Sequence, residues 1–240
     1  MARNTITLNG NPSDEIPGLI IQELPPITKP AVRTEVETID GRDGDITTKL
    51  GYAAYDKEIL IGLYGDYEIN EIIAFFDSEG TVTFSNEEDK FYRYQIFEQI
   101  DFERLVRFRT ATVKLHVQPF KFSLNEMART FDVDQLASQL IRITNNGNIY
   151  SRPQITLVGT GTINLSINSE QLLVVNLGET ENSITIDTEL MEAYYGTPDA
   201  LANRAVDGDY DNLKLNVGGN QISWSGNLNT IIINNYSRWV

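Results

Sequence analysis

Cysteine is absent from the 240 residues of the chain, and histidine occurs once, as His116. Without cysteine there is no disulfide, no thiolate nucleophile and no cysteine zinc site, so packing must hold the fold together. His116 alternates with Leu115 and Val117, which places it on the polar side of an amphipathic strand. We therefore expect a surface histidine rather than a general base, and we predict no catalytic residues.

Long apolar runs and an excess of basic charge are also missing. The longest apolar run is residues 72–76, whereas a membrane span needs about 18 residues, and the first ten residues lack the apolar stretch of a signal peptide. The 19 Lys and Arg against 34 Asp and Glu give a net charge of −15, which repels nucleic acid phosphates and anionic membranes. We expect a soluble protein made without a cleavable export signal, with no membrane partner and no specific binding of DNA.

Most of the chain alternates apolar and polar residues with the period of a β-strand, so we predict an all-β fold with one short helix. The helix is expected at about 68–79, with Asp66 as a possible cap and Gly80 at its end. Its apolar stripe at i, i+3, i+4 and i+7 is Ile69, Ile72, Ile73 and Phe76. Strands are expected in the first half at Ala31–Ile39, Glu58–Tyr64, Thr81–Ser85, Phe91–Phe97 and Thr110–Gln118.

The second half is rich in asparagine, with 16 from residue 124 onward against 5 before it. Asn and Gly favour tight turns, and strands spaced about ten residues apart between such turns are typical of a β-sandwich. We predict a β domain at 1–122, a linker at 123–137 that follows Pro119, and a β-sandwich at 138–240. Its strands are expected at Ser138–Thr144, Gln154–Val158, Thr162–Asn168, Gln171–Leu177, Ser183–Asp187, Leu213–Val217, Gln221–Ser225 and Thr230–Asn234.

Three short motifs are candidates for a metal or cofactor site, and each is better explained as a turn or loop. Asp207–Asp211 alternates carboxylates like a calcium loop, but an EF-hand would need Gly and Glu where the chain has Asn212 and Gly218. Residues 40–45, with three acids and two glycines, indicate a tight loop first and a cation site only weakly. Residues 159–161 begin like a dinucleotide loop, but Asn164 replaces the third glycine, so we expect a hairpin turn. We predict no metal and no cofactor.

Several aromatic residues occur in consecutive pairs, whose members point to opposite faces of a strand. One of Phe91 and Tyr92, and one of Tyr194 and Tyr195, is therefore expected to face outward. Outward aromatics can anchor a protein interface or stack on a sugar, and the interface is our preferred interpretation. The other aromatics in this group are Tyr64, Tyr67, Tyr94, Trp224 and Trp239.

The order of these segments resembles that of the distal tail proteins of long-tailed, non-contractile phages over nearly the whole chain. In the first half the resemblance lies in residues 32–45, 58–64, the helix, 80–86, 89–92 and 118–122. In the second half it lies in residues 143–148, 151–155, 185–187, 219–222 and 238–239. The chain departs from the family at residues 211–220, where the family often has a proline before the Gly-Asn turn.

The resemblance implies a structural virion protein of the phage tail tip or baseplate, made in the cytoplasm of the host bacterium. The resemblance also implies that the first domain, 1–122, is ring-forming: six copies would form a ring, possibly stacked, that joins the tail tube to the tip and lets DNA pass. It implies that the second domain, 138–240, is a galectin-like, jelly-roll sandwich. The implied partners are the tail tube protein, the hub and tape-measure proteins, and receptor-binding proteins attached to the second domain. We expect the ring to assemble more readily at moderate salt, because ions screen the repulsion between acidic subunits.

A carbohydrate-binding module that recognises cell-wall glycan is the alternative function, and a wall hydrolase is third. Galectins bind sugar with histidine, arginines, asparagines and a stacking tryptophan. From Ser123 onward the chain has no histidine, and its arginines are Arg129, Arg142, Arg152, Arg204 and Arg238. We therefore expect a galectin-like fold without galectin-like sugar binding. Saturable sugar binding that is abolished by Trp224→Ala would contradict this expectation.

Charged residues of the first half bear on the DNA path that the resemblance implies. A low-friction channel should have few unpaired cations, yet four basic residues lie close together: Arg104, Arg107, Arg109 and Lys114. We expect them either to pair with Asp101 and Glu103 or to face neighbouring proteins. The acids available to line the channel include Asp40, Asp43, Asp45, Glu87, Glu88 and Asp89.

Overall fold

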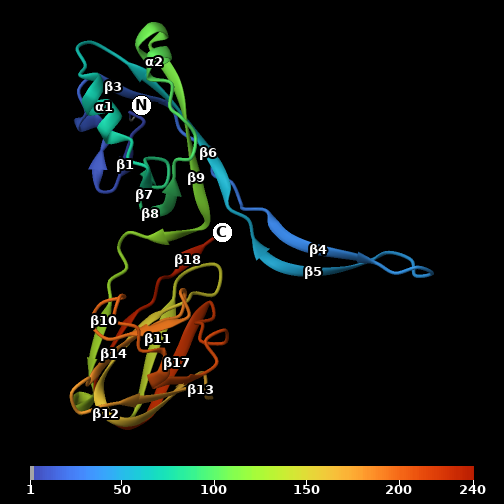
Figure 1. The fold of residues 1–240 in the computed structure, drawn as a ribbon, viewed down its shortest axis with the longest axis vertical. Helices are drawn as coiled ribbons and strands as arrows, with labels where there is room; N and C mark the ends of the chain where they lie inside the picture. Colours follow the sequence, from blue (N-terminus) through green and yellow to red (C-terminus); the bar gives the residue numbers. More distant parts are fainter. Residues whose placement is uncertain (1–2) are drawn as a thin grey trace. The chain divides into compact units, whose positions relative to one another are not determined.

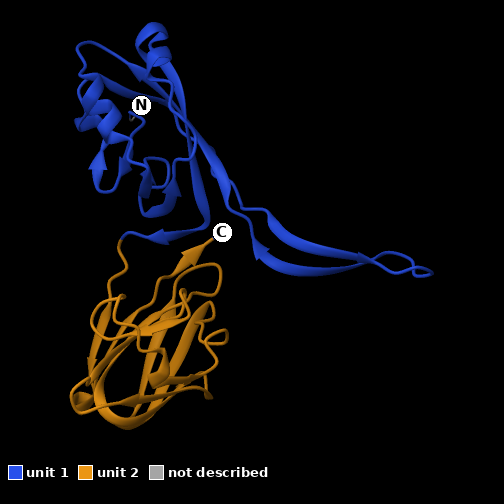
Figure 2. Cartoon of the chain, in the orientation of Figure 1, with its two compact units in different colours: residues 1–124, 240 blue, residues 125–239 orange. Residues whose placement is uncertain are grey.

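In the computed structural model, which describes residues 3–240, the chain forms two compact β-rich units (Figure 2). Unit 1 runs to Leu124 and also takes in Val240, and unit 2 is Asn125–Trp239. Each unit has its own hydrophobic core, made of side chains from that unit alone. The predicted all-β fold class, with two β domains, is confirmed. No helix of the described part is long and apolar enough to cross a membrane.

Unit 1 is built on one antiparallel sheet with the strand order β2-β1-β7-β8-β9-β6-β3. Its inward face carries alternating apolar residues, such as Ile59 and Ile61 in β6 and Val113 and Leu115 in β9, all fully buried. The strands are β1 (Ile6–Leu8), β2 (Asn11–Pro12), β3 (Leu19–Glu23), β6 (Tyr55–Leu63), β7 (Glu79–Phe84), β8 (Lys90–Gln95) and β9 (Thr110–Ser123), and a 3-10 turn η1 (Ser13–Glu15) follows β2.

The predicted helix is present as α1 (Ile69–Phe75), but it is shorter than expected, and the residues that it buries differ in part from the expected stripe. Glu68, not Asp66, caps it, because the Glu68 side chain accepts a hydrogen bond from the Asn70 backbone N–H at 3.3 Å. The helix ends at Phe76 rather than at Gly80, which already belongs to β7. The core contacts come from Ile72, Phe75 and Phe76, whereas Ile73 is 44 % exposed. The expected stripe was therefore wrong at Ile73.

Besides β1, β2, η1 and β3, two further elements of unit 1 were not predicted. A second helix, α2 (Phe102–Phe108), precedes β9 and ends at Arg109, which adopts a left-handed conformation with φ 60°. The strand β5 (Asp45–Tyr52) pairs with β4 (Val32–Thr38) to form a separate two-stranded sheet that projects from unit 1 (Figure 1).

Unit 2 is a sheet of order β10-β17-β12-β13-β16, in which β11 also pairs with β17, and β14 pairs with β12 and β15. Its core is rich in Ile, Leu and Val, with Trp224 among them. Its elements are β10 (Arg129–Asp132), η2 (Val133–Gln135), β11 (Leu140–Asn145), β12 (Gln154–Ile167), β13 (Glu170–Leu177), β14 (Ser183–Asp187), β15 (Glu192–Tyr194), η3 (Asn203–Ala205), β16 (Val206–Gly208), β17 (Gly218–Asn234) and β18 (Arg238–Trp239).

Two pairs of expected strands in unit 2 are single long strands. Residues 159–161 do not reverse the chain but shift the register inside β12, and β17 runs through Gly226 in the same way. Both glycines sit where a side chain has no room: a Cβ on Gly159 would lie 2.3 Å from the Asn227 carbonyl oxygen, and one on Gly226 would lie 2.3 Å from that of Thr162. The irregularities lie beside these glycines: residues 161–163 of β12 fall opposite Gly226, and Asn229 of β17 falls between the partners of Val158 and Gly159.

Three further expectations are corrected by backbone pairing. The segment expected as a linker, 123–137, contains β10, whose residues pair with β17 from Ile233 to Thr230. Because proline cannot donate to a strand ladder, Pro119 was expected to stop the sheet or to lie on its edge. It does not stop the sheet, because β9 continues past it to Ser123 after a register shift against β8. Residues 213–217 form no strand, although Leu215 makes an isolated bridge with Ser151.

Candidate functional site

The projecting hairpin of β4 and β5, with the loop between them, is the candidate functional site of unit 1, and we call residues 32–52 the arm. Every residue of β4 is exposed, and in β5 only Ile46, Gly51 and Tyr52 are partly covered. An isolated two-stranded hairpin in water is marginally stable at best. The arm therefore presents two faces and two open strand edges that a partner would stabilise.

Strand register separates the arm into two faces, because directly opposed residues lie on the same side. One face has Val36 opposite Thr47 and Val32 opposite Tyr52, with Val32 and Val36 41 % and 55 % exposed. We call the opposite side the acidic face: Glu37 lies opposite Ile46 there and Glu35 opposite Thr48, and Arg33, opposite Gly51, lies on the same side.

The base of the arm is fixed to the body of unit 1. The Ala53 N–H donates to the Ala31 carbonyl at 2.8 Å, which closes the hairpin at its root. The Tyr52 ring meets the Phe120 ring edge-on, with centroids 5.6 Å apart. These contacts at its root therefore fix the direction in which the arm leaves unit 1. Beyond the root, β4 and β5 pair with each other.

A buried lysine binds the segment that leads from β3 into the arm. Lys57 of β6 is 3 % exposed, and its Nζ donates to the Pro26 carbonyl at 2.9 Å. The ammonium group also lies 4.9 Å from the centre of the Tyr92 ring. Burial lowers the pKa of Lys57, and the nearby Glu87 carboxylate opposes that shift.

Glu87 belongs to this buried group of charges and forms an ion pair with Lys121. Its other oxygen accepts a hydrogen bond from the Tyr92 hydroxyl at 2.6 Å. Burial, followed by the Glu87 contact, raises the pKa of Tyr92 well above its ordinary value. Lys121 and Tyr92 therefore hold both oxygens of the Glu87 carboxylate. Of its expected companions, Asp89 pairs with Lys90 and Glu88 is exposed.

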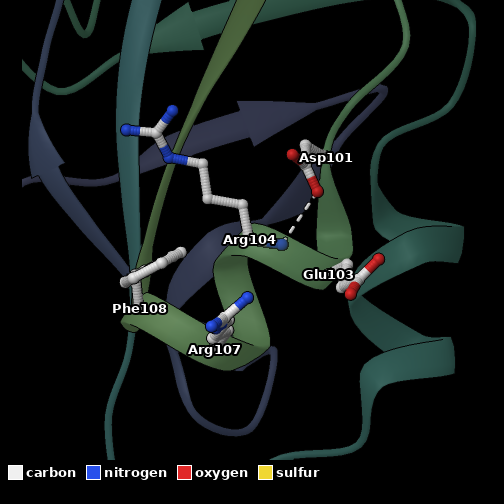
Figure 3. Close-up of a pocket in the computed structure, with 5 residues that line it drawn as sticks. All are labelled: Asp101, Glu103, Arg104, Arg107 and Phe108. Atoms are coloured by element: carbon white, nitrogen blue, oxygen red, sulfur yellow. Dashed lines mark hydrogen bonds between the residues drawn. The ribbon is translucent and has the colours of Figure 1, made fainter.

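Helix α2 presents a basic and aromatic face (Figure 3). Arg104, Arg107 and Phe108 follow the i, i+3, i+4 spacing of one helix face, and together with Asp101 and Glu103 they line an open hollow of about 500 Å³. We call Arg104, Arg107 and Phe108 the α2 face. Phe108 is 62 % exposed, and the Arg107 guanidinium lies 5.3 Å from the centre of its ring. Exposed arginine beside exposed aromatic is the composition of interface hot spots.

The expected pairing of these arginines with Asp101 and Glu103 does not occur. Figure 3 shows that the Asp101 carboxylate accepts from the Arg104 backbone N–H, at 2.8 Å, and so caps the helix instead. Across residues 3–240, no carboxylate lies within ion-pair distance of the Arg104 or Arg107 guanidinium. Arg109 lies over the Tyr67 ring at 5.0 Å, and Lys114 pairs with Glu98 at 2.8 Å.

The other motifs singled out in the sequence are His116, the acidic turn at Asp209 and residues 40–45. His116 Nδ1 lies 2.8 Å from an Asp56 carboxylate oxygen on the neighbouring strand β6. Asp209 accepts two hydrogen bonds from Asn212, which lower the pKa of Asp209 and form a capped turn. Residues 40–45 lie at the tip of the arm. In the described part of the chain, no three His, Asp or Glu residues are grouped so as to hold a metal ion.

The aromatic residues divide between core and surface. Tyr92 and Tyr194 are buried and their neighbours Phe91 and Tyr195 are partly exposed, so one member of each pair faces inward. Trp224 is 5 % exposed in the core of unit 2, so it is not positioned to stack on a sugar. The most exposed aromatics are three that flank the sheet of unit 1: Tyr64, Phe97 and Phe108.

Sequence reasoning missed both the second strand of the arm and α2. β5 mixes Thr, Lys, Leu and Gly without a clear alternation, because neither of its faces is buried in unit 1. The signal for α2 was Asp101 three residues before Arg104, the spacing of a side-chain cap. Leu105 is the only residue of α2 that is fully buried, so no apolar stripe marks this helix.

No family model and no curated protein matches this sequence. Its fold matches the crystal structure of the Dit protein of phage SPP1, a paradigm of the hub adsorption apparatus in phages that infect Gram-positive bacteria. The TM-score is 0.61 and the identity 16 %, over 97 % of this chain and 98 % of that chain. Two structures of the activated phage P2 baseplate, with Ca and with Sr, align at TM-score 0.44 and 8 % identity, over 97 % and 96 % of this chain and 98 % and 97 % of theirs. The resemblance to distal tail proteins is thereby confirmed at the level of the fold: this chain has the fold of a phage Dit protein.

Proposed function

We propose that the protein is a structural hub subunit at the tail tip of a long-tailed, non-contractile phage, and not an enzyme. Six copies form a ring that joins the tail tube to the tip, lets DNA pass and anchors receptor-binding components. The observation that carries the proposal is the fold shared with the SPP1 hub protein, which spans nearly the full length of both chains. A match over both units supports a common role for the whole chain rather than for one module.

The arm supports self-assembly in particular. It is an exposed hairpin on a folded body, with open edges and exposed valines, and such an element gains stability by binding another chain. An element that protrudes on one side and binds elsewhere on the next copy makes head-to-tail contacts, which close into rings when the rotation allows. Such a contact, repeated in one sense from copy to copy, gives a cyclic assembly.

The experiment is to measure the assembly of the purified chain by light scattering and by electron microscopy of single particles. We expect rings of six copies at moderate salt. The matched control is an armless chain in which residues 33–51 are replaced by Asn-Gly. Val32 and Tyr52 are directly opposed, so a two-residue turn closes the hairpin at its root. We expect the armless chain to be a folded monomer.

A wild-type chain that stays monomeric at high concentration and at every salt tested would overturn the proposal. A clearing zone on peptidoglycan from the pure protein would overturn the non-enzymatic part of it. Saturable binding of cell-wall glycan by the full chain would favour the carbohydrate-binding alternative.

A further inference from the structure

We propose that the two Asn-Gly pairs of the chain, Asn9-Gly10 and Asn146-Gly147, are latent deamidation sites, and that the fold keeps each pair unreactive by fixing a different partner of the reaction. The support is the hydrogen bonding and packing of each pair. The inference does not depend on the hub function, because the chemistry is read on each chain whatever its assembly.

Deamidation joins two groups of neighbouring residues. The backbone nitrogen of the following residue attacks the side-chain carbonyl carbon of the asparagine, loses its proton and expels ammonia, which leaves a cyclic succinimide. Water then opens the ring to aspartate or isoaspartate. Glycine has no side chain to hinder the attack and is conformationally free, so an Asn-Gly pair is especially prone to it. The sequence contains this pair twice.

In Asn9-Gly10 the group that is attacked is fixed. The pair forms the two-residue turn between β1 and β2, with φ angles of 50° and 86°. The Asn9 carboxamide lies against β7: its Oδ1 accepts from the Thr81 backbone N–H at 2.8 Å, and its Nδ2 donates to the Glu79 carbonyl at 3.1 Å. The side chain would have to break both hydrogen bonds before its carbonyl carbon could turn to the Gly10 nitrogen.

Gly80 provides the space that the Asn9 side chain occupies. A Cβ on residue 80 would lie 1.7 Å from the Asn9 Oδ1, so a residue with a side chain would displace the carboxamide from β7. The glycine is therefore part of the arrangement that protects Asn9.

In Asn146-Gly147 the attacking nitrogen is fixed instead. The Asn146 side chain is exposed and makes no hydrogen bond within the described part of the chain. The Gly147 N–H, however, donates to the Asn145 Oδ1 at 2.9 Å. Asn145 is 1 % exposed, and its Nδ2 donates to the carbonyls of Ile149 at 2.9 Å and Leu215 at 3.1 Å. The acceptor is therefore itself held in place, with every polar atom of its carboxamide in use.

The backbone of Gly147 is also packed tightly against the C-terminal segment of unit 2. A Cβ on Gly147 would lie 2.2 Å from the Arg238 carbonyl oxygen, and the Asn148 N–H donates to that oxygen at 3.2 Å. Isoaspartate adds a methylene group to the backbone, so a turn modified at Asn146 could not keep this close approach. Protection of the pair therefore preserves the attachment of the C-terminal segment.

The first experiment compares folded and unfolded chains. The full chain is incubated at mildly alkaline pH, with and without enough guanidinium chloride to unfold it, and digested. Mass spectrometry then locates the gain of about 1 Da that marks each deamidated peptide. We expect both pairs to react at least about tenfold more slowly in the folded chain, because reaction requires local opening. Equal rates in the two conditions, at either pair, would overturn the proposal.

The second experiment releases the nitrogen of Gly147. Asn145→Ala removes its acceptor and should raise the rate at Asn146 by at least about tenfold, with no change at Asn9. The matched control is Ser237→Ala, which removes the hydroxyl that accepts from the Asn146 N–H at 3.1 Å and leaves the Gly147 N–H bonded. Hydrogen exchange of β12 and β17 shows whether unit 2 is folded. A folded Asn145→Ala chain with an unchanged rate, or equal acceleration by the control, would overturn the proposal.

The third experiment releases the side chain of Asn9, in the other unit. Gly80→Ala should raise the rate at Asn9 alone. The control is Gly65→Ala, which places alanine at φ +66° in unit 1 with no atom within 4 Å of the new Cβ and leaves Asn9 untouched. Acceleration by both variants, or by neither, would overturn the proposal. This pair of variants decides the question if Asn145→Ala unfolds unit 2, because each unit has its own core.

Discussion

Ile72 and Ile73 are adjacent in α1 and differ sharply in burial, so replacing each with alanine tests how unit 1 is packed. Ile72 is 0 % exposed and belongs to the core of unit 1, whereas Ile73 is 44 % exposed. The two substitutions remove the same atoms from the same helix and change helix propensity equally. Any difference between them therefore measures burial.

The expected cost of Ile72→Ala follows from the buried atoms. Removing three buried carbon groups costs about 2.4 kcal/mol at about 0.8 kcal/mol each, and the cavity left behind raises this to about 3–4 kcal/mol. For a unit of about 120 residues this lowers the midpoint of thermal unfolding by roughly 10–15 °C. For Ile73→Ala we expect less than about 1 kcal/mol, because the removed atoms are half in water and alanine favours the helix.

The assay is hydrogen–deuterium exchange in increasing urea, read on peptides from β6 and β9 of unit 1. Peptides from β12 and β17 serve as the internal reference for unit 2. The protein concentration is kept equal and low, because assembly itself raises apparent stability. Equal losses for the two variants, or a loss below about 1 kcal/mol for Ile72→Ala, would show that α1 is not packed on the sheet through Ile72.

Three further predictions concern unit 2, the alkaline limit of stability and the DNA path. Gly226→Ala should destabilise unit 2 by about 2 kcal/mol or more in urea titration, because Gly226 has φ +108° and no room for a Cβ, while Gly219→Ala, with no atom within 4 Å, should be nearly neutral. Burial raises the pKa of Tyr94 to about 12, so its contribution is complete below the unfolded value of about 10 and is lost as the pH rises from there toward 12. Stability of Tyr94→Phe should therefore fall less steeply than wild type over that range, and parallel curves would contradict the assignment. Assembled rings should bind double-stranded DNA negligibly at physiological salt in gel-shift titration; submicromolar binding that persists at moderate salt would mean a basic lumen.

Local pattern in the sequence was enough for the all-β class and for most strands that have one buried face. Strand β14 was predicted with the bounds that the structure shows, Ser183–Asp187, because its alternation of buried and half-buried residues follows the pleat. The position of α1 was predicted from its apolar spacing, and the lack of a catalytic pattern around His116 was apparent from its neighbours. The order of the segments also carried the resemblance to distal tail proteins.

Only the tertiary structure decided which faces and turns those segments use. Spacing at i, i+3, i+4 does not say where the core lies, so Ile73 was grouped with Ile72 although it faces water. Glycine permits both a chain reversal and a register shift within a strand, and pairing with β17 keeps residues 159–161 inside the continuous strand β12.

The arm and the α2 face show the limit most clearly. Periodicity reports burial within one chain, and neither β5 nor α2 has a broad buried face there, so no clear apolar pattern marks these two elements. Their charges are visible in the sequence, but the pairing of Asp101 with a backbone N–H, which leaves the Arg104 and Arg107 guanidinium groups without a carboxylate, is set by the helix end. The acidic composition could be read from the sequence, whereas the separation of opposite charges to the two ends of the β6–β9 ladder exists only in the folded chain.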